Sequence, residues 1–309
     1  MRLAILSDIH GNLPALEAVL EEVRRHTVDG ILVAGDTVGG PQQMEAIRLL
    51  RSLGSWMIQG NNERYLQDYD GGNIPEAQRH SLQWAATRWM YHHLDRETLD
   101  FVMALPEGRV IALEGTALIR VVHGSPRNLS EGLFPDRDPA KLHLFKRAGF
   151  LSDGRQPPRL DRVLQQIAEP VLVCGHTHIP WQQREGSQLV LNPGSVGASI
   201  DGDLRAQYAL LTWQGGHWQA EQRMVPYDLE RIRAAFAESG FLQGGGGFAR
   251  ACSRGMETGQ NVPGFLVAHA YALAAEAGYE SCRVVPDAIW EQAVATFDWE
   301  SWTYGGQQA

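Results

Sequence analysis

The chain has few cysteines and no long hydrophobic run. Its three cysteines, Cys174, Cys252 and Cys282, are too few and too unevenly spaced for a disulfide framework, and none forms a CxxC pair typical of zinc sites. No apolar stretch reaches the roughly 18 residues that a membrane span needs, and the first residues lack the apolar core of a signal peptide. We therefore expect a reduced, cytoplasmic protein with no membrane partner.

Basic residues are also scarce. The 27 Lys and Arg residues face 36 Asp and Glu residues, for a formal net charge of −9. This is the wrong sign for a protein that neutralises nucleic-acid phosphates, so a nucleic-acid partner is not expected. If the ligand is a phosphate compound, local positive charge must overcome the global repulsion, and bound metal ions would supply it best.

The size and composition fit an enzyme-like globular protein. The 309 residues can form one large domain or two small ones. With 44% hydrophobic and 20% charged residues, the chain lies far from the disordered class, which lacks apolar residues to bury.

Strand and helix patterns alternate over the first 60 residues. Apolar runs at 2–7, 30–34 and 55–59 predict strands, and helical spacing at 13–23 and 42–53 predicts helices between them, the first capped by Asn12 with Pro14 in its first turn. This βαβαβ order predicts a largely parallel sheet with right-handed crossovers.

The middle of the chain changes pattern. Residues 76–105 are mostly helical by spacing, 109–113 and 117–122 form a hairpin, and a helix at 160–167 precedes a strand at 171–174. Short strands at 181–184, 189–191, 208–213 and 218–225, separated by glycine-containing turns, predict an antiparallel meander. We therefore expect a second, mixed sheet.

A run of four glycines, Gly244 to Gly247, follows a helix predicted at 228–238. No strand precedes the run and no Lys-Ser or Lys-Thr follows it, so a flexible linker is expected rather than a phosphate loop. Two helices, at 263–277 and 286–297, are expected beyond it. We thus expect a catalytic domain over 1–243, and a glycine linker with a small helical C-terminal extension over 244–309.

The predicted core strands of the first 180 residues end in polar motifs rich in metal-ligand residue types. Taken singly, each motif is an ordinary turn, helix cap or surface histidine. Because the carboxyl ends of parallel strands share one crevice, their joint placement indicates a metal site. The candidate ligands are Asp8, His10, Asp36, Asn61, His123, His176 and His178.

This ligand set combines imidazole, carboxylate and amide without thiolate, which suits manganese, iron, nickel or zinc. Seven ligands are too many for one tetrahedral ion, and they suit two divalent ions about 3.5 to 4 Å apart that share a bridging carboxylate. Two such ions outweigh the charges of Asp8 and Asp36, so the pocket would stay positive and attract phosphate.

The motifs SDIHGN, GDTVG, GNNE, HGSPR, GHTH and NPGSVG occur in the order and strand-end placement of the calcineurin-like metallophosphoesterases. The chain resembles this family over about residues 1–240, most closely its bacterial and archaeal phosphodiesterase-type members. The resemblance implies a four-layer αββα sandwich of two mixed sheets flanked by helices.

The resemblance also implies roles for individual residues. Asp8, His10 and His178 would bind one metal, and Asn61, His123 and His176 the other, with Asp36 bridging them. Manganese is the first choice for both ions. A hydroxide bridging the two ions would attack phosphorus in line while the ions neutralise the developing charge.

One position departs from the commoner family pattern. Many members carry a histidine general acid where this chain has Asn62, and an amide donates a hydrogen bond but delivers no proton. Asn62 is nevertheless the candidate residue beside the leaving group, and Glu63 is expected to act only as an acid in the first turn of a helix.

Three arginines lie beside the motifs, Arg64, Arg127 and Arg205, and Arg127 is the best candidate for a phosphate-binding side chain. We expect a phosphodiesterase acting on small phosphate esters or nucleotide derivatives. A phosphomonoesterase or protein phosphatase of the same fold, and a non-catalytic metal-binding scaffold, remain as alternatives. The oligomeric state does not follow from the sequence.

Overall fold

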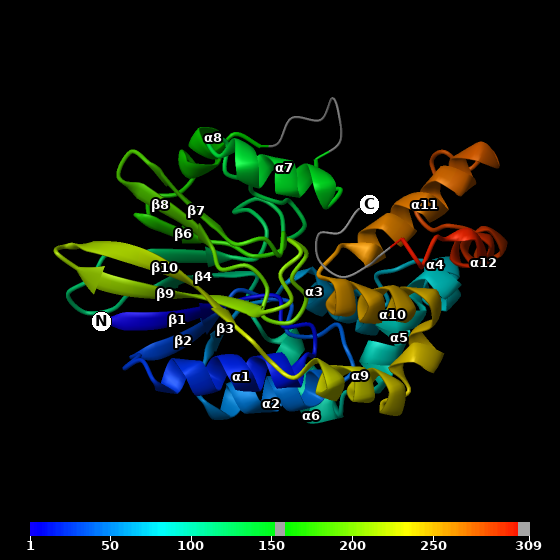
Figure 1. Cartoon of the computed structure of the whole chain (residues 1–309), viewed down its shortest axis with the longest axis horizontal. Helices are drawn as coiled ribbons and strands as arrows, with labels where there is room; N and C mark the ends of the chain where they lie inside the picture. The colour runs from blue at the N-terminus through cyan, green and yellow to red at the C-terminus, as the bar shows by residue number, and fades with distance from the viewer. Residues whose placement is uncertain (152–157, 302–309) are drawn as a thin grey trace.

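Two five-stranded mixed sheets form the centre of the computed structural model, which describes residues 1–151 and 158–301 (Figure 1). The first sheet has the strand order β10-β9-β1-β2-β3, in which β1, β2 and β3 are parallel and β9 and β10 are antiparallel to their neighbours. Its strands are β1 (Arg2–Leu6), β2 (Gly30–Val33), β3 (Trp56–Met57), β9 (Ala206–Gln214) and β10 (His217–Val225).

The second sheet has the order β4-β5-β6-β8-β7, with β5, β6 and β8 parallel and an antiparallel strand at each edge. Its strands are β4 (Gly108–Ile111), β5 (Ile119–Val122), β6 (Val171–Val173), β7 (Trp181–Glu185) and β8 (Gln188–Asn192).

Helices cover the outer face of each sheet. Those of the first sheet include α1 (Leu13–Arg24), α2 (Gln43–Ser52) and α6 (Arg96–Met103), and those of the second are α7 (Pro139–Arg147) and α8 (Leu160–Leu164) (Figure 1). The predicted αββα sandwich of two mixed sheets is therefore confirmed. Asn12 caps α1 as predicted, since its side-chain oxygen accepts a hydrogen bond from the Ala15 N–H at 3.1 Å.

Strand β1 shows how the sequence produces these layers. Leu3 and Ile5 pack into the core between the two sheets, whereas Ala4 and Leu6 pack on the other face with α1. Because both faces are buried, the strand is a continuous apolar run rather than an alternating one.

The predicted meander is corrected by the structure. Each predicted hairpin forms, but β7 and β8 belong to the second sheet, whereas β9 and β10 belong to the first. Strand β9 pairs antiparallel with β1, with Leu211 opposite Leu3, and residues 206–211 are all buried. The two faces of β9 pack into the cores on either side of the first sheet, and its two edges pair with β1 and β10.

The remaining helices gather beyond one end of the sheets (Figure 1). The segment between β3 and β4 adds α3 (Asn61–Asp70), α4 (Glu76–His80), the 3-10 turn η1 (Leu82–Trp84) and α5 (Ala85–His92). After β10 follow α9 (Leu229–Glu238), α10 (Phe241–Thr258), α11 (Val262–Glu276) and α12 (Asp287–Thr296). Helices α7 and α10 had no counterpart among the predicted elements.

The predicted glycine linker is also corrected. Gly244 to Gly247 lie inside α10, which is kinked at Gly246. A Cβ atom on Gly244 would lie 2.3 Å from the Trp89 ring of α5, and one on Gly247 would lie 2.4 Å from Val294 of α12. The glycines therefore permit close helix packing. The division of the chain at residue 243 stays a prediction, but a helix, not a linker, crosses it.

Within residues 1–151 and 158–301, no helix combines the length and apolar character that crossing a bilayer requires.

Candidate metal centre

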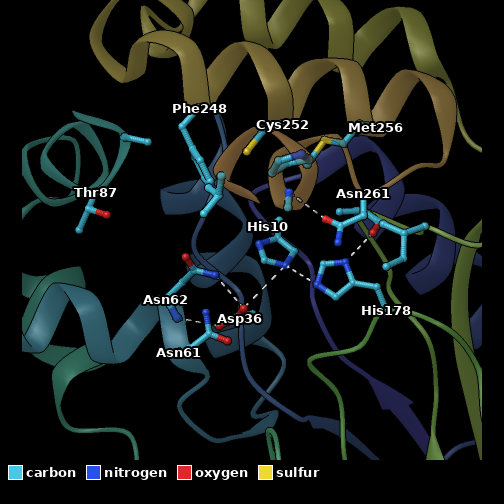
Figure 2. A pocket seen from close by; sticks show the side chains of 18 of the residues that line it. His10, Asp36, Asn61, Asn62, Thr87, His178, Phe248, Cys252, Met256 and Asn261 are labelled. Carbon is cyan, nitrogen blue, oxygen red and sulfur yellow. Dashed lines mark hydrogen bonds and ion pairs between the residues drawn. The ribbon is translucent and has the colours of Figure 1, made fainter. Parts of the chain in front are cut away.

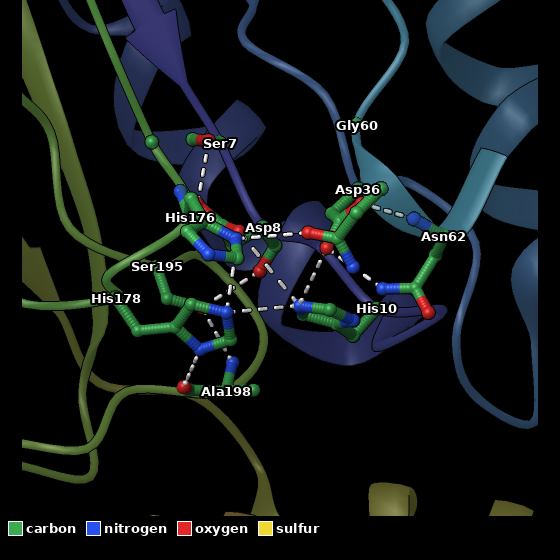
Figure 3. A network of polar contacts seen from close by, with 12 residues as sticks. Ser7, Asp8, His10, Asp36, Gly60, Asn62, His176, His178, Ser195 and Ala198 are labelled. Carbon is green, nitrogen blue, oxygen red and sulfur yellow. Dashed lines mark hydrogen bonds and ion pairs between the residues drawn. The ribbon is translucent and has the colours of Figure 1, made fainter. Parts of the chain in front are cut away.

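The seven predicted ligands meet at the carboxyl ends of the parallel strands. Figure 3 labels Asp8, His10, Asp36, His176 and His178. Asp8 and His10 follow β1, and Asp36 follows β2. The other ligands come from the start of α3 after β3 and from the loops after β5 and β6, namely Asn61, His123, His176 and His178. The two sheets therefore contribute to a single cluster.

The backbone at this cluster is strained. Five non-glycine residues in the described part of the chain have positive φ, and all five are predicted ligands, namely Asp8 (55°), His10 (48°), Asp36 (51°), His176 (67°) and His178 (54°). Such a conformation is costly for a residue with a side chain and persists only where the surrounding structure imposes it. Strain confined to these residues is typical of a functional site.

Asp8, His10 and His178 form the first candidate metal-binding group. The Nε2 atoms of His10 and His178 lie 3.1 Å apart, and Oδ1 of Asp8 lies 3.2 Å from Nε2 of His178. The Nδ1–H of His178 donates to the Ala198 carbonyl at 2.6 Å, which leaves Nε2 free to act as a ligand.

The second candidate group contains Asp8, Asp36 and His123. The Nδ1–H of His123 donates to the Ala34 carbonyl at 2.7 Å and so orients Nε2 toward the carboxylates. Oδ1 of Asn61 lies 3.1 Å from Nε2 of His123 and 2.8 Å from Nδ1 of His176, which brings these predicted ligands together.

Asp36 lies between the two predicted metal positions. Its Oδ2 is 3.8 Å from Nε2 of His10 and 3.5 Å from Nε2 of His123. Asp8 is similarly central, because its Oδ1 lies 3.8 Å from His10 Nε2 and 3.9 Å from His123 Nε2. Both carboxylates are thus within reach of both groups, and the bridging role of Asp36 stays a prediction.

The ionisable groups of the cluster influence one another. Burial is the largest single influence on His123 and by itself would lower its pKa. The carboxylates of Asp36 and Asp8 and the hydrogen bonds to Asp36 and Ala34 together outweigh burial and raise the pKa to about 10. Burial would raise the pKa of Asp36, yet His123 and His10 hold it well below its usual range. Burial and then the neighbouring His178 lower the pKa of His10 to about 4.

The cluster fits divalent cations. Oδ1 of Asp8 is fully buried and makes no hydrogen bond, which is costly for a carboxylate oxygen unless a cation faces it. Imidazole nitrogens and carboxylate oxygens from several strands converge on the same small volume, and this donor set suits manganese, iron, nickel or zinc.

Glu63 has a larger role than the one predicted for it. It lies in the first turn of α3 as predicted, but it is fully buried, and its carboxylate accepts hydrogen bonds from the backbone N–H groups of Asp36, Thr37, Val38 and Gly60. Burial and the nearby Asp36 raise the pKa of Glu63 to about 7. Glu63 therefore holds the loop that carries Asp36. The sequence signal for it was its position three residues after Gly60, from which an acid can accept a hydrogen bond from the N-cap N–H.

The NPGSVG motif also supports the site. The hydroxyl of Ser195 donates to the Asp8 carbonyl at 2.7 Å and accepts a hydrogen bond from the Ala198 N–H at 2.8 Å. Asn192 donates to the Gly175 carbonyl at 2.7 Å, next to His176. This motif therefore fastens two ligand loops to each other.

Asn62 is hydrogen-bonded to Asp36. Its backbone N–H and its side-chain amide each donate a hydrogen bond to the Asp36 carboxylate (Figure 3). Its side chain also lines the cavity next to the metal centre. A direct role of Asn62 beside the leaving group stays a prediction.

The arginines are engaged elsewhere. Arg127 makes a bidentate ion pair with Glu131, with N–O distances of 2.6 and 2.9 Å, and is not among the described residues that line the cavity. Arg64 pairs with Asp68 and Glu107, and Arg205 pairs with Asp203. Phosphate binding by Arg127 stays a prediction, and in this structure it would require the pair with Glu131 to open.

A cavity of about 450 Å³ adjoins the cluster (Figure 2). His10, Asp36, Asn62 and His178 line one side of it. The opposite side is formed by residues of the C-terminal helices and the turn between them, including Phe248, Cys252, Met256 and Asn261. The sequence showed no role for these helices, because nothing in their own pattern indicates what they cover.

Comparisons with known proteins agree with this architecture. The chain is 27% identical over 249 residues to an uncharacterized protein of Methanocaldococcus jannaschii. The alignment covers 74% of this chain and 89% of that protein. The crystal structure of a metallophosphoesterase from Sphaerobacter thermophilus matches with 26% identity and a TM-score of 0.58, over 80% of this chain and 99% of the other. A hypothetical protein from Pyrococcus horikoshii has the same fold, with 21% identity and a TM-score of 0.58 over 76% of this chain and 92% of its own.

The profile of the calcineurin-like phosphoesterase superfamily domain matches residues 1–216, which include all seven predicted ligands. Since this match covers more than half of the sequence, the chain belongs to the calcineurin-like phosphoesterase superfamily.

Proposed function

We propose that the protein is a phosphodiesterase that works with two divalent cations and cleaves small phosphate esters or nucleotide derivatives. The observation that carries this proposal is the convergence of predicted ligands on two adjacent groups that share the buried carboxylate of Asp8. The centre forms one side of a cavity of a size typical for small-molecule sites. A cytoplasmic location is part of the same proposal.

We assign Asp8, His10 and His178 to one ion and the remaining histidines with Asn61 to the other, with Asp36 shared. When bound, two divalent cations would draw charge from a phosphoryl group and make water a stronger acid. Manganese is our first choice for both ions, and iron, nickel and zinc suit the same donors.

Neighbouring residues of the chain position the proposed ligand Asp36. Glu63 holds the Asp36 loop through four backbone N–H groups. Asn62 donates to Asp36 and carries no proton that it can release. We therefore expect esters with good leaving groups to react fastest.

Three alternatives are less well supported. A protein phosphatase needs an open surface for a polypeptide, whereas helices α10 and α11 face this metal centre across the cavity. A non-catalytic scaffold would not need the strained backbone that five predicted ligands share. A nucleic-acid substrate is disfavoured by the net charge of −9.

The test begins with the metal content of the purified protein, measured by mass spectrometry. Hydrolysis of bis(p-nitrophenyl) phosphate and p-nitrophenyl phosphate is then followed with manganese, with chelator, and after manganese is restored. We expect two ions per chain and a higher kcat/KM for the diester. Chelator-resistant turnover, or a clear preference for the monoester, would contradict the proposal.

A further inference from the structure

The cavity beside the metal centre has mainly apolar walls. Five aromatic side chains line it, together with several aliphatic ones and Met90 and Met256. These aromatic residues are Tyr65, Trp84, Phe150, Phe241 and Phe248. They come from helices on both sides of the cavity and from the loop after α7, so a group that enters it loses water on several faces.

Lysine and arginine do not occur in the described part of these walls. Among the described residues that line the cavity, Asp36 is the one carboxylate. The nearby Arg64 and Arg127 point their charges at carboxylates of their own helix or loop. A second phosphate or a carboxylate on the substrate would therefore find no lysine or arginine to balance it in the described part of the lining.

Two side-chain amides at the far side of the cavity make hydrogen bonds to backbone groups. Asn261 accepts a hydrogen bond from the Gly264 N–H at 3.1 Å and donates to the Ala148 carbonyl at 2.9 Å. The side-chain oxygen of Gln83 accepts from the Val285 N–H at 2.8 Å. The Gln83 oxygen and the Asn261 amide are therefore already engaged within the protein.

We infer that the cavity binds an uncharged, apolar ring carried by the phosphate ester, and that it discriminates against substrates with a second anionic group. This inference rests on the proposed function and narrows its substrate class. It favours aryl-type esters over nucleoside polyphosphates, whose further phosphates would find no cation in the described lining.

The C-terminal helices supply this selectivity. Phe248, Cys252 and Met256 lie on α10, across the cavity from His10 and His178 (Figure 2). The glycines of α10 let the helix approach Trp89 closely, which keeps this wall near the metal centre. The segment beyond residue 243 therefore contributes to the substrate site.

The first experiment compares three diesters with the same p-nitrophenolate leaving group. Their second substituents are methyl, phenyl and 4-carboxyphenyl, so the last two match in ring and differ in charge. With manganese present, we expect kcat/KM for the phenyl ester to exceed that for the methyl ester by about tenfold or more, because the ring is buried. We expect kcat/KM for the 4-carboxyphenyl ester to be no higher than that for the methyl ester.

A second experiment places a cation in the cavity. In Cys252→Lys the preference for phenyl over 4-carboxyphenyl should fall by about tenfold or reverse, because the ammonium would pair with the carboxylate. Cys252→Ser, which is nearly isosteric and neutral, should keep the wild-type preference. If Cys252→Lys fails to fold, the three-ester comparison on the wild-type protein decides by itself.

A binding measurement separates this inference from the proposed function. Isothermal titration calorimetry compares 1-naphthylmethylphosphonate with methylphosphonate on the manganese-loaded protein, and the naphthyl compound should bind at least about tenfold more tightly. If it does so while no ester is cleaved, the cavity assignment stands and the proposed function fails. Equal kcat/KM for all three esters, or equal affinity for both phosphonates, would overturn the assignment and leave the phosphodiesterase proposal intact.

Discussion

Asn62 donates two hydrogen bonds to Asp36. Its backbone N–H reaches Oδ1 at 2.9 Å and its side-chain amide reaches Oδ2 at 2.7 Å. The same Oδ2 lies between His10 and His123. Asn62 is therefore directed at the carboxylate that we expect to bridge two cations, and we propose that it positions Asp36.

Asp36→Asn should abolish hydrolysis and weaken metal retention more than any other single ligand change. An amide carries no charge, and its NH2 group would face the donors of Asn62. We expect kcat/KM to fall by about 100-fold or more, and metal content, measured by mass spectrometry, to fall below two ions per chain. Asp100→Asn, on the exposed face of α6, serves as the control and should retain both. Wild-type activity in Asp36→Asn would rule out the shared-carboxylate arrangement.

Metal removal should lower thermal stability. Asp8 and Asp36 are both buried and belong to the same cluster, so a bound divalent cation would balance their negative charges. A ligand that binds only the folded state stabilises it by about 3 kcal/mol at a concentration 100 times its Kd. Scanning calorimetry should therefore show a lower Tm after chelation and recovery when manganese is added. An unchanged Tm would mean that the cluster binds no ion tightly.

Asn62→His should change the dependence of rate on the leaving group. Without a proton donor, wild-type rates across a series of aryl esters should fall steeply as the leaving-group pKa rises. A histidine at this position should flatten the slope and raise activity toward alkyl esters by about 100-fold, provided that Glu63 leaves room for the ring. Asn62→Ala is the control, because it removes the hydrogen bond to Asp36 and adds no acid. A flat wild-type slope would show that another group supplies the proton.

Glu63→Gln should destabilise the fold. The carboxylate accepts from four buried N–H groups, whereas a glutamine side chain offers one acceptor oxygen and brings an NH2 group against the other donors. We expect a loss of about 2 to 4 kcal/mol in the free energy of unfolding, measured with urea. Glu107 forms an exposed ion pair with Arg64. Glu107→Gln should therefore change the free energy of unfolding by less than about 1 kcal/mol. Equal stability of the two variants would contradict the anchoring role.

Gly244→Ala should also be destabilising, although alanine favours helices. The added Cβ would lie 2.3 Å from Cδ1 of Trp89, so α10 or the ring must move. We expect a net loss of about 1 to 2 kcal/mol in the free energy of unfolding. The neighbouring Gln243→Ala, on an exposed position of the same helix, should stay within about 0.5 kcal/mol of wild type. Stabilisation by Gly244→Ala would instead support a loosely packed glycine segment.

Much of the architecture followed from local sequence patterns. Apolar runs and helical spacing identified β1, α1 and β2 closely, because burial on a strand or helix imposes its own period on the side chains. Parallel strands bring their carboxyl ends together, so the sequence pattern alone was enough to assign residues as distant as Asp8 and His178 to one cluster.

Other features depended on contacts between distant segments. No local pattern distinguishes a hairpin that extends its own sheet from one that joins another, and so the β9–β10 hairpin was assigned to the wrong neighbours. The glycines of α10 have the composition of a linker, and only the positions of Trp89 and Val294 show that they are packing residues. The burial of Glu63 likewise depends on where whole elements lie. The residue types and their order determined which donor groups the metal centre offers. Long-range packing determined the shape and lining of the cavity. The cavity walls come from elements far apart in the sequence, and no local pattern predicts that these elements will face one another.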